Sequence, residues 1–484
     1  MAFKIPVRVT IFITALIVYL VFIYIKPEST SIGMVDLAMS VVDKGDLYLR
    51  YSGASKDVSF FGSNYLLGHF PGTALPVIGI YSIARPFLSG ISGYDLLVVI
   101  HVLSIIFFAA PCGALIVVVY YSFLRRLGGD GPSSVTLAYL TAFGTMIFGY
   151  STSLYKGTPA TLFVFSAFYI LFCEKERSVQ RVWPFLAVGV LLGSAVITDL
   201  AVLYACIIIA FYALYIGKIK SALALTAGFI LPIVLLFVYF RAAFGSFFFS
   251  PYDFRVNPDP NMITYPRIRN MFSLLFGTLA GFFTYMPVML LSLWGLVESL
   301  RRKKSIPEMI VISAVLVTGA LYFSCYVRKG NPYQPAWPHD AHITVRYLLS
   351  MCPFMMIPAI FIFKRSSRVL WQVLGGISIF FAYLSAQAGL MPYGGWHLMY
   401  AFKVFITGFG MPFIFSDTLP RHMGIETFHT YISRPYVKTA ELFSGDGFSL
   451  VTDLIIKQAA FFCVFIFVAI AIGTALIRLN KKRV

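Results

Sequence analysis

Two carboxylates that follow the first apolar stretch, Asp36 and Asp57, are the residues best suited to chemistry in this sequence. A carboxylate held near a membrane surface can accept the proton of an attacking hydroxyl group. Charged groups cost free energy close to lipid, so their presence there favours a functional site. Each acid also has a structural interpretation, as part of a solvated helix face for Asp36 and as an ion pair with Lys56 for Asp57. The choice of base between them stays open.

Cationic and aromatic residues near these acids, or before a later apolar stretch, indicate an anion-binding pocket. An arginine can hold two phosphate oxygens at once, and aromatic faces stack on the C–H bonds of sugars. We expect a phosphate group to be bound by Lys56, His69 and Arg346, and the pocket rim to be formed by Tyr65, Trp337, His339 and Asp340. No cofactor is required by this pattern, although His339, Asp340 and His342 have ligand types that a divalent cation could use.

Composition places these residues in a polytopic membrane protein. Of 484 residues, 59% are hydrophobic and only 12% are charged, with a mean hydropathy of +0.83. Such values lie outside the range of soluble domains. The first apolar stretch lacks a small-residue cleavage site and is predicted to stay as a membrane anchor. The six cysteines are scattered without metal-binding spacing.

Roughly twelve apolar stretches are long enough to be membrane-spanning helices. They lie near residues 9–25, 97–123, 133–153, 159–173, 182–198, 200–217, 221–243, 284–300, 307–327, 345–363, 369–390 and 456–477. With both termini in the cytoplasm, the short loops "EKER", "KIK", "RRKK" and "KRSSR" and the tail "KKRV" all fall inside. The net charge of +18 is therefore a topology signal of the positive-inside kind and not a nucleic-acid footprint.

This topology predicts one domain over residues 1–484, all α-helical, whose long segments face the extracytoplasmic side. These segments are 26–96, 244–283, 328–344 and 391–455. Long loops in compact proteins usually carry function. In the first loop, the apolar spacing predicts an amphipathic helix over about 32–43 with Asp36 on its wet face. Residues 72–88 are predicted to form a second interfacial segment.

A series of motifs resembles one family of membrane enzymes. In order, it comprises "GSNYLLGHFPGTALPVIGIYSIARP", "AFGTMIFGYSTSLYKG", "LLGSAVITDLAVLY", "RAAFGSFFFSPY", "GTLAGFFTYMPVMLLSLWGL" and "VRYLLSMCPF". Together with the acidic first loop, it is similar to the GT-C superfamily of integral-membrane glycosyltransferases over residues 28–363. Many members have an adjacent Asp-Glu pair early in this loop, where this sequence reads Ser29, Thr30 and Ser31. The resemblance implies a catalytic acid at or near Asp36.

The resemblance also implies a function. Such enzymes move a sugar from a polyprenyl or dolichyl phosphate to a glycan, lipid or protein acceptor, outside the cytoplasm. We therefore expect a hexosyl- or pentosyltransferase of the cell envelope, in the plasma membrane, without a nucleic-acid partner. The alternative is a transporter or flippase of lipid-linked sugars that performs no bond chemistry. Ionisable residues in the middle of the predicted spans would favour the transporter, and there are almost none.

Overall fold

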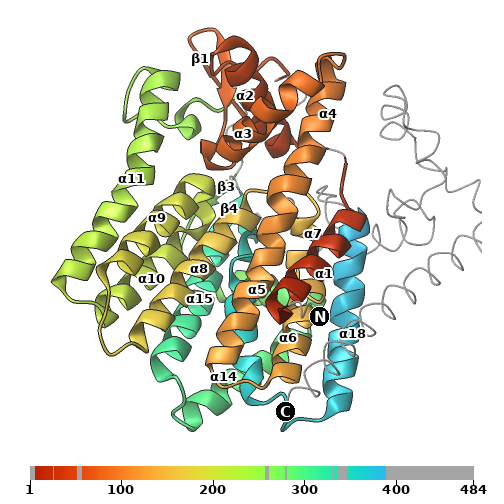
Figure 1. Cartoon of the computed structure of the whole chain (residues 1–484), viewed down its shortest axis with the longest axis vertical. Helices are drawn as coiled ribbons and strands as arrows, with labels where there is room; N and C mark the ends of the chain where they lie inside the picture. Colours follow the sequence, from red (N-terminus) through yellow and green to blue (C-terminus); the bar gives the residue numbers. More distant parts are fainter. Residues whose placement is uncertain are drawn as a thin grey trace, which may run out of the picture.

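Helices make up most of the structure, a computed structural model that describes residues 6–25, 27–51, 57–256, 261–277, 281–328, 331–335 and 346–388. They form a bundle that is capped at one end by α2, α3 and a β-hairpin (Figure 1). We call this end the α2 side. The helices are α1 (Val7–Val21), α2 (Ser29–Lys44), α3 (Ala74–Ala84), α4 (Gly93–Ser104), α5 (Ala110–Arg126), α6 (Gly131–Phe143), α7 (Ile147–Ser151), α8 (Gly157–Lys175), α9 (Val182–Thr198), α10 (Leu203–Ile216), α11 (Ile219–Phe244), α12 (Ile268–Phe276), α13 (Phe282–Tyr285), α14 (Val288–Arg301), α15 (Ile306–Ser324), α17 (Met351–Met356) and α18 (Arg368–Ala388).

The strands are short and lie outside the bundle helices. The hairpin pairs β1 (Val58–Phe61) with β2 (Asn64–Leu67). A second, fully antiparallel sheet has the order β3 (Asn261–Ile263), β4 (Tyr326–Arg328), β5 (Asn331–Pro335). The second sheet joins segments that are far apart in the chain, because β3 pairs with β4 more than sixty residues later.

Within the described residues, five helical runs are long and apolar enough to cross a membrane: Gly93–Arg126, Gly157–Lys175, Ile219–Phe244, Ile306–Ser324 and Arg368–Ala386. The first of them is a continuous helix in which α4 and α5 are joined by a π-helical turn at Ile105–Ala109. Four shorter apolar helices accompany them. The predicted class of helical membrane protein is confirmed, whereas a number of about twelve spans is not. The last predicted span, 456–477, lies outside the described residues.

Glycines allow a close contact between helices α9 and α11. A Cβ atom on Gly189 would lie 2.1 Å from the carbonyl oxygen of Leu225, and one on Gly228 would lie 2.1 Å from that of Leu186. Gly193, four residues after Gly189, is similarly close to the carbonyl of Phe229. Small residues at this spacing let two backbones approach within a membrane, where packing drives helix association.

Ion pairs tie the helix ends together on the side opposite α2. Glu308, in the first turn of α15, is 1% exposed and lies 2.7 Å from the Lys175 ammonium group. Its carboxylate also accepts a hydrogen bond of 2.6 Å from the hydroxyl of Tyr212. These contacts join α8, α10 and α15. Basic side chains recur at this side, with the ion pairs Arg126–Glu176, Lys364–Asp130 and Arg365–Glu298.

The first loop contains the predicted helix, but its environment differs from the prediction. Helix α2 covers residues 29–44 and ends at Gly45, whose φ of 71° is left-handed. The face that includes Asp36 and Ser40 was expected to be wet, yet both residues are 1% exposed. The reason is tertiary, because residues 46–51 fold back over this face and α3 packs on the helix. The second predicted segment is α3, which is not one of the candidate spans.

Candidate active site

The β-hairpin brings Asp57 beside the Gly68–His69 dipeptide. Its two-residue turn uses left-handed residues, Gly62 with φ 56° and Ser63 with φ 73°, which match the twist of a tight hairpin. At the open end, the Gly68 N–H donates to the carbonyl oxygen of Asp57 over 3.0 Å. A Cβ atom at Gly68 would lie 2.5 Å from that oxygen, so only glycine permits this approach.

The start of α2 holds the side chains of both Asp57 and His69. The hydroxyl of Thr30 donates to Asp57 Oδ2 over 2.7 Å. His69 Nε2 lies 3.4 Å from the carbonyl oxygen of the same threonine, and Nδ1 lies 3.1 Å from that of Phe70. Just before the helix, the Glu28 N–H donates to Ser31 Oγ over 2.7 Å, which caps the helix and fixes the backbone at Glu28.

Arg255 joins a second loop to this cluster. Its segment runs along β1, where the Val256 N–H donates to the Val58 carbonyl oxygen over 3.0 Å. The Arg255 Nε–H donates to the carbonyl oxygen of Gly68 over 3.1 Å. Its Nη2 lies 3.5 Å from Asp57 Oδ1. The guanidinium group therefore clamps the hairpin and neutralises Asp57 from the side opposite Thr30.

A further ion pair lies at the ends of α8 and α9. Lys156, which precedes α8, has its ammonium group 3.5 Å from Asp199 Oδ1 at the end of α9. The Pro71–Gly72 turn packs on this end, since a Cβ atom at Gly72 would lie 2.6 Å from the Ile197 carbonyl oxygen. Lys156 is close enough to His69 for its charge to help lower the pKa of the imidazole.

Arg346, at the start of a 3₁₀ turn at Arg346–Leu348, lies near the acids Glu28 and Asp57. Its guanidinium lies over the ring of Tyr347, 5.2 Å from the ring centre, and Nη2 donates to the Tyr347 hydroxyl over 3.3 Å. Its positive charge acts on Glu28 and Asp57 and lowers the pKa of each. Five segments of the chain thus converge on one cluster, which consists of Glu28, Asp57, His69, Lys156, Asp199, Arg255 and Arg346.

Two of the three acids in this cluster, Glu28 and Asp57, have opposite protonation behaviour. Burial raises the pKa of Glu28 to about 8, a shift that Asp57 increases and Arg346 reduces. Burial also acts to raise the pKa of Asp57, but other groups outweigh it and lower the pKa. These groups are His69, which is charged only in the acidic range, the Thr30 hydroxyl, and the permanently charged Arg255 and Arg346. Near neutral pH, Asp57 is therefore a carboxylate and Glu28 is largely a neutral acid. The Glu28 Oε1 atom is buried without a hydrogen-bond partner in the described part of the chain.

His69 is neutral in this environment. Burial lowers its pKa to about 4, and the charge of Lys156 acts in the same direction. Its two ring nitrogens both face carbonyl oxygens, and a neutral imidazole can donate to only one of them. The ring is therefore an uncharged polar group beside Asp57 and not a fixed cation.

Asp36, the other predicted acid, lies in a separate place at the middle of α2. Its Oδ1 accepts the Arg50 N–H over 3.1 Å, and its Oδ2 accepts the Tyr51 N–H over 2.7 Å. Both oxygens are therefore occupied by the loop that covers the helix. Burial raises the pKa of this carboxyl, and the two backbone hydrogen bonds and the charge of Arg50 oppose that shift.

Replacing Asp36 with Asn is expected to lower stability by about 1–3 kcal/mol, because one buried N–H would lose its acceptor and face an amide NH₂ group. The measurement is the thermal midpoint in detergent, with turnover per folded molecule as the second readout. Asp46→Asn is the matched control, since Asp46 forms an exposed ion pair with Arg50. Loss of turnover without loss of stability would instead support Asp36 as the base.

The remaining predicted site residues fall in two groups. Tyr65 is 40% exposed on the outer face of the hairpin, where it packs against Phe60. Lys56, Trp337, His339 and Asp340 lie outside the described residues. Within the part of the chain that the structure describes, no group of three or more His, Cys, Asp or Glu side chains could hold a metal ion.

Glu28 and Arg255 are cluster members that the sequence reasoning missed. The GT-C resemblance implies an Asp-Glu pair at the Ser29–Ser31 stretch, and Glu28 directly precedes that stretch. Its position in the sequence could therefore have identified it as a candidate acid. Arg255 gave no local signal, because only the docking of its loop along β1 brings it to Asp57.

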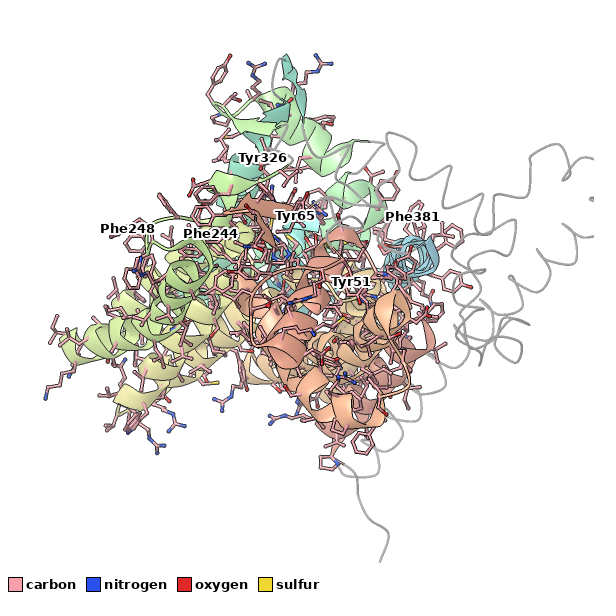
Figure 2. All side chains as sticks on the ribbon, turned by 90° about the horizontal axis from the view of Figure 1, so that it is seen from above. Tyr51, Tyr65, Phe244, Phe248, Tyr326 and Phe381 are labelled. Atoms are coloured by element: carbon pink, nitrogen blue, oxygen red, sulfur yellow. The ribbon has the colours of Figure 1, made fainter. Side chains whose placement is uncertain are left out.

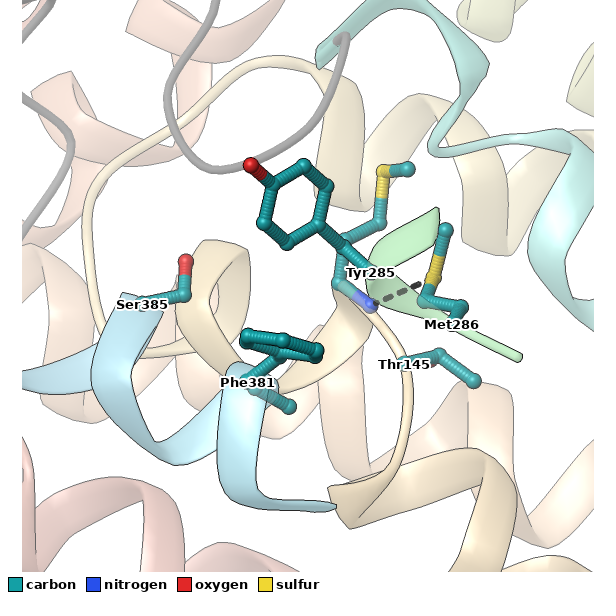
Figure 3. Close-up of a pocket in the computed structure, with 7 residues that line it drawn as sticks. Thr145, Tyr285, Met286, Phe381 and Ser385 are labelled. Atoms are coloured by element: carbon teal, nitrogen blue, oxygen red, sulfur yellow. Dashed lines mark hydrogen bonds between the residues drawn. The ribbon is translucent and has the colours of Figure 1, made fainter. Parts of the chain in front are cut away.

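A small pocket near the break between α6 and α7 is apart from this chemistry (Figure 3). It is lined by Thr145, Met146, Tyr285, Met286, Phe381, Ala382 and Ser385. The Met146 N–H donates to the Met286 sulfur over 3.4 Å. The lining has no carboxylate or basic group, so it offers packing space and no acid–base function.

The fold agrees with the resemblance of the sequence to the GT-C superfamily. It matches the crystal structure of ArnT from Cupriavidus metallidurans bound to undecaprenyl phosphate, with a TM-score of 0.52 and 14% identity over 93% of this chain and 78% of that chain. The apo structure of the same ArnT matches with a TM-score of 0.51 and 15% identity, over 87% and 73%. No protein-family model matches the sequence, and a search of curated proteins found no significant match.

A weaker similarity extends to an archaeal protein. The oligosaccharyltransferase AglB from Archaeoglobus fulgidus, in complex with an inhibitory peptide and a dolichol-phosphate, has a TM-score of 0.44 and 13% identity, over 89% of this chain and 60% of AglB. At these identities the comparisons with ArnT establish the fold, and the cluster described above is the basis for function.

Proposed function

We propose that this protein is a membrane glycosyltransferase that moves a hexosyl or pentosyl group from a polyprenyl phosphate to a glycan, lipid or protein acceptor. The observation that carries the proposal is the cluster on the α2 side, in which two acids of opposite protonation behaviour meet Arg346 and Arg255. Pairs of acids whose environments separate their pKa values are typical of acid–base catalysis. The GT-C fold adds support, since ArnT with this fold was solved with undecaprenyl phosphate.

Glu28 is the proposed general base. Its raised pKa lies near physiological pH, which suits a group that must both take and release a proton. In the reaction, its carboxylate removes the proton of the acceptor hydroxyl as the oxygen attacks the anomeric carbon. The new C–O bond forms while the sugar–phosphate C–O bond breaks, and the bonding electrons leave with the lipid phosphate.

Asp57 has the role of a fixed negative charge. It stays ionised, orients Thr30 and Arg255 through the contacts described above, and can stabilise positive charge at the anomeric carbon. Arg346 is proposed to bind the donor phosphate and the lipid phosphate that leaves. Roles for Lys56, Trp337, His339 and Asp340 at the same pocket remain predictions from sequence, as does a divalent cation.

The α2 side is proposed to be extracytoplasmic. The ends of α5, α8, α14 and α15 on the other side carry basic groups, including Arg126, Lys175 and Arg302. The positive-inside rule assigns such ends to the cytoplasm. The cluster would then lie on the extracytoplasmic side of the membrane, where we expect the lipid-linked sugar donor to be used.

The experiment combines the purified protein in nanodiscs with a panel of polyprenyl-phosphate sugars and acceptor lipids or glycans. Product formation with release of polyprenyl phosphate is expected for one donor in the panel. The Asp57→Asn variant should lose most of this turnover, and Asp46→Asn should keep it. Movement of intact donor across vesicle membranes, with no released lipid phosphate, would instead identify a transporter or flippase.

Replacing Arg346 with Gln is expected to raise the KM for the donor by about 10–100-fold, because a charge-assisted hydrogen bond contributes about 1.5–3 kcal/mol. Arg346→Lys should recover part of the loss, since a lysine keeps the charge but cannot bind two oxygens in one plane. The measurement is the donor KM at saturating acceptor. Arg85→Gln is the control, because Arg85 pairs with Asp43 on the surface. An unchanged donor KM would remove Arg346 from the phosphate site.

A further inference from the structure

Helix α12 has two faces of very different character. Ile268, Phe272 and Phe276 recur every fourth residue and are 81%, 63% and 41% exposed. The opposite face carries Asn270 and Leu274, which are buried at 1% and 0% exposure. Among the described helices of nine residues or more, α12 separates apolar from polar side chains most strongly. Its apolar stripe therefore points away from the protein.

The depth of α12 relative to the membrane follows from its contacts with α15. Helix α15 is a candidate span of 19 residues, a length that matches the hydrocarbon core. The Asn270 amide donates to the carbonyl oxygen of Ser324, the last residue of α15, over 3.3 Å. Just before α12, the Thr264 N–H donates to the Cys325 carbonyl oxygen over 2.8 Å. Helix α12 thus begins level with the membrane–water boundary on the α2 side.

The residues around the stripe fit that boundary. Arg267 lies over the ring of Tyr265, 4.8 Å from its centre, and donates to the Tyr265 hydroxyl over 3.0 Å. Tyr265 is 67% exposed, and Arg269 is exposed as well. Tyrosines and basic residues at this level are typical of membrane interfaces, where rings meet the headgroups and cations meet phosphate. The sheet that carries Tyr326 projects at one edge of the bundle (Figure 2).

We propose that α12 is a membrane-surface anchor whose Ile268–Phe272–Phe276 stripe inserts into the lipid interface on the α2 side, with the exposed Arg269 at the headgroup phosphates. Such a helix binds through buried apolar area and charge attraction to lipid. Its position also bears on the candidate site. Segment 251–276 is tethered to Asp57 through Arg255 at one end and would be held to the bilayer through α12 at the other.

The test uses the full-length protein in phosphatidylcholine–phosphatidylglycerol nanodiscs, with the photoreactive residue p-benzoylphenylalanine at one position. The substituted positions are Phe272 and Phe276 on the stripe. Phe60, which is 48% exposed on the hairpin above the bundle, is the matched aromatic control. Gel-filtration profiles equal to that of the unmodified protein show that each variant folds. Mass spectrometry then identifies what each position has captured.

Lipid adducts at positions 272 and 276 several times more abundant than at position 60 are the expected result. Adducts to peptides of this chain or of a second copy would overturn the proposal, because the stripe would then be a protein contact. Lipid adducts no more frequent than at position 60 would also overturn it. The readout does not involve sugar transfer, so its failure leaves the proposed enzymatic function untouched.

Discussion

The Glu28→Gln variant is expected to lose about 10²–10⁴-fold in turnover, the range that a positioned general base contributes. Glutamine keeps the size of the side chain and an oxygen that can accept the backbone N–H of Ser31 in the capping box of α2, but it cannot act as a base. Because Glu28 is largely neutral in the resting protein, the substitution changes its charge little and should preserve the fold. The measurement is kcat for sugar transfer, with the thermal midpoint as a check on folding.

The matched control for this prediction is Glu176→Gln, which removes a carboxylate from an exposed ion pair with Arg126 at the other end of the bundle. Its turnover should equal that of the unmodified protein. A Glu28→Asp variant should recover part of the activity, since a carboxylate is restored at a shorter reach. If Glu28→Gln retains full turnover while Asp57→Asn is inactive, Asp57 is the base and Glu28 a structural acid.

Turnover is expected to rise about tenfold per pH unit below pH 8 and to level off above it, because the pKa of Glu28 is about 8 and only its ionised form accepts a proton. Asp57 raises this pKa and Arg346 lowers it. The residual activity of Asp57→Asn should therefore have its midpoint at lower pH, and that of Arg346→Gln at higher pH. The measurement is kcat against pH at saturating donor.

If the pH midpoints of the Asp57→Asn and Arg346→Gln variants move in opposite directions, the two residues act on Glu28 through their charges. A variant that was merely misfolded would have a lower kcat at every pH and an unchanged midpoint. Arg85→Gln is the control, because its ion pair with Asp43 lies outside the cluster. A profile that is flat between pH 6 and 9 in the unmodified protein would reject Glu28 as the titrating base.

Glu28 and His69 also link the stability of the fold to pH. Glu28 has an ordinary pKa of 4.5 and a folded value of about 8, so the folded protein binds more protons between these values. Its contribution to the free energy of unfolding therefore falls as pH rises through this window. His69 is opposite, since its pKa drops from 6.5 to about 4 and its contribution rises with pH between them. Of these two groups, Glu28 alone contributes a trend between pH 6.5 and 8, and Glu28→Gln should abolish that contribution.

The sequence by itself determined the class of protein, and it pointed to the region of the candidate site. Apolar runs of helical length and basic loops on one side of the membrane do not depend on distant contacts, because they reflect the cost of polar groups in lipid. For the same reason, the prediction of helix over 32–43 and the focus on Asp57, His69 and Arg346 needed only local patterns. The GT-C resemblance agreed with the fold that the structure has.

Only the tertiary structure decided which acids meet. Asp36 and Asp57 have the same side chain and lie in the same loop. The Asp36 carboxylate accepts hydrogen bonds from two backbone N–H groups of the segment that covers α2, whereas the Asp57 carboxylate lies near two arginines. Glu28 and Arg255 join the cluster through chain segments far apart in sequence. A carboxyl's pKa depends on burial and on charges a few ångströms away, and those distances are fixed by long-range packing that local sequence patterns do not encode.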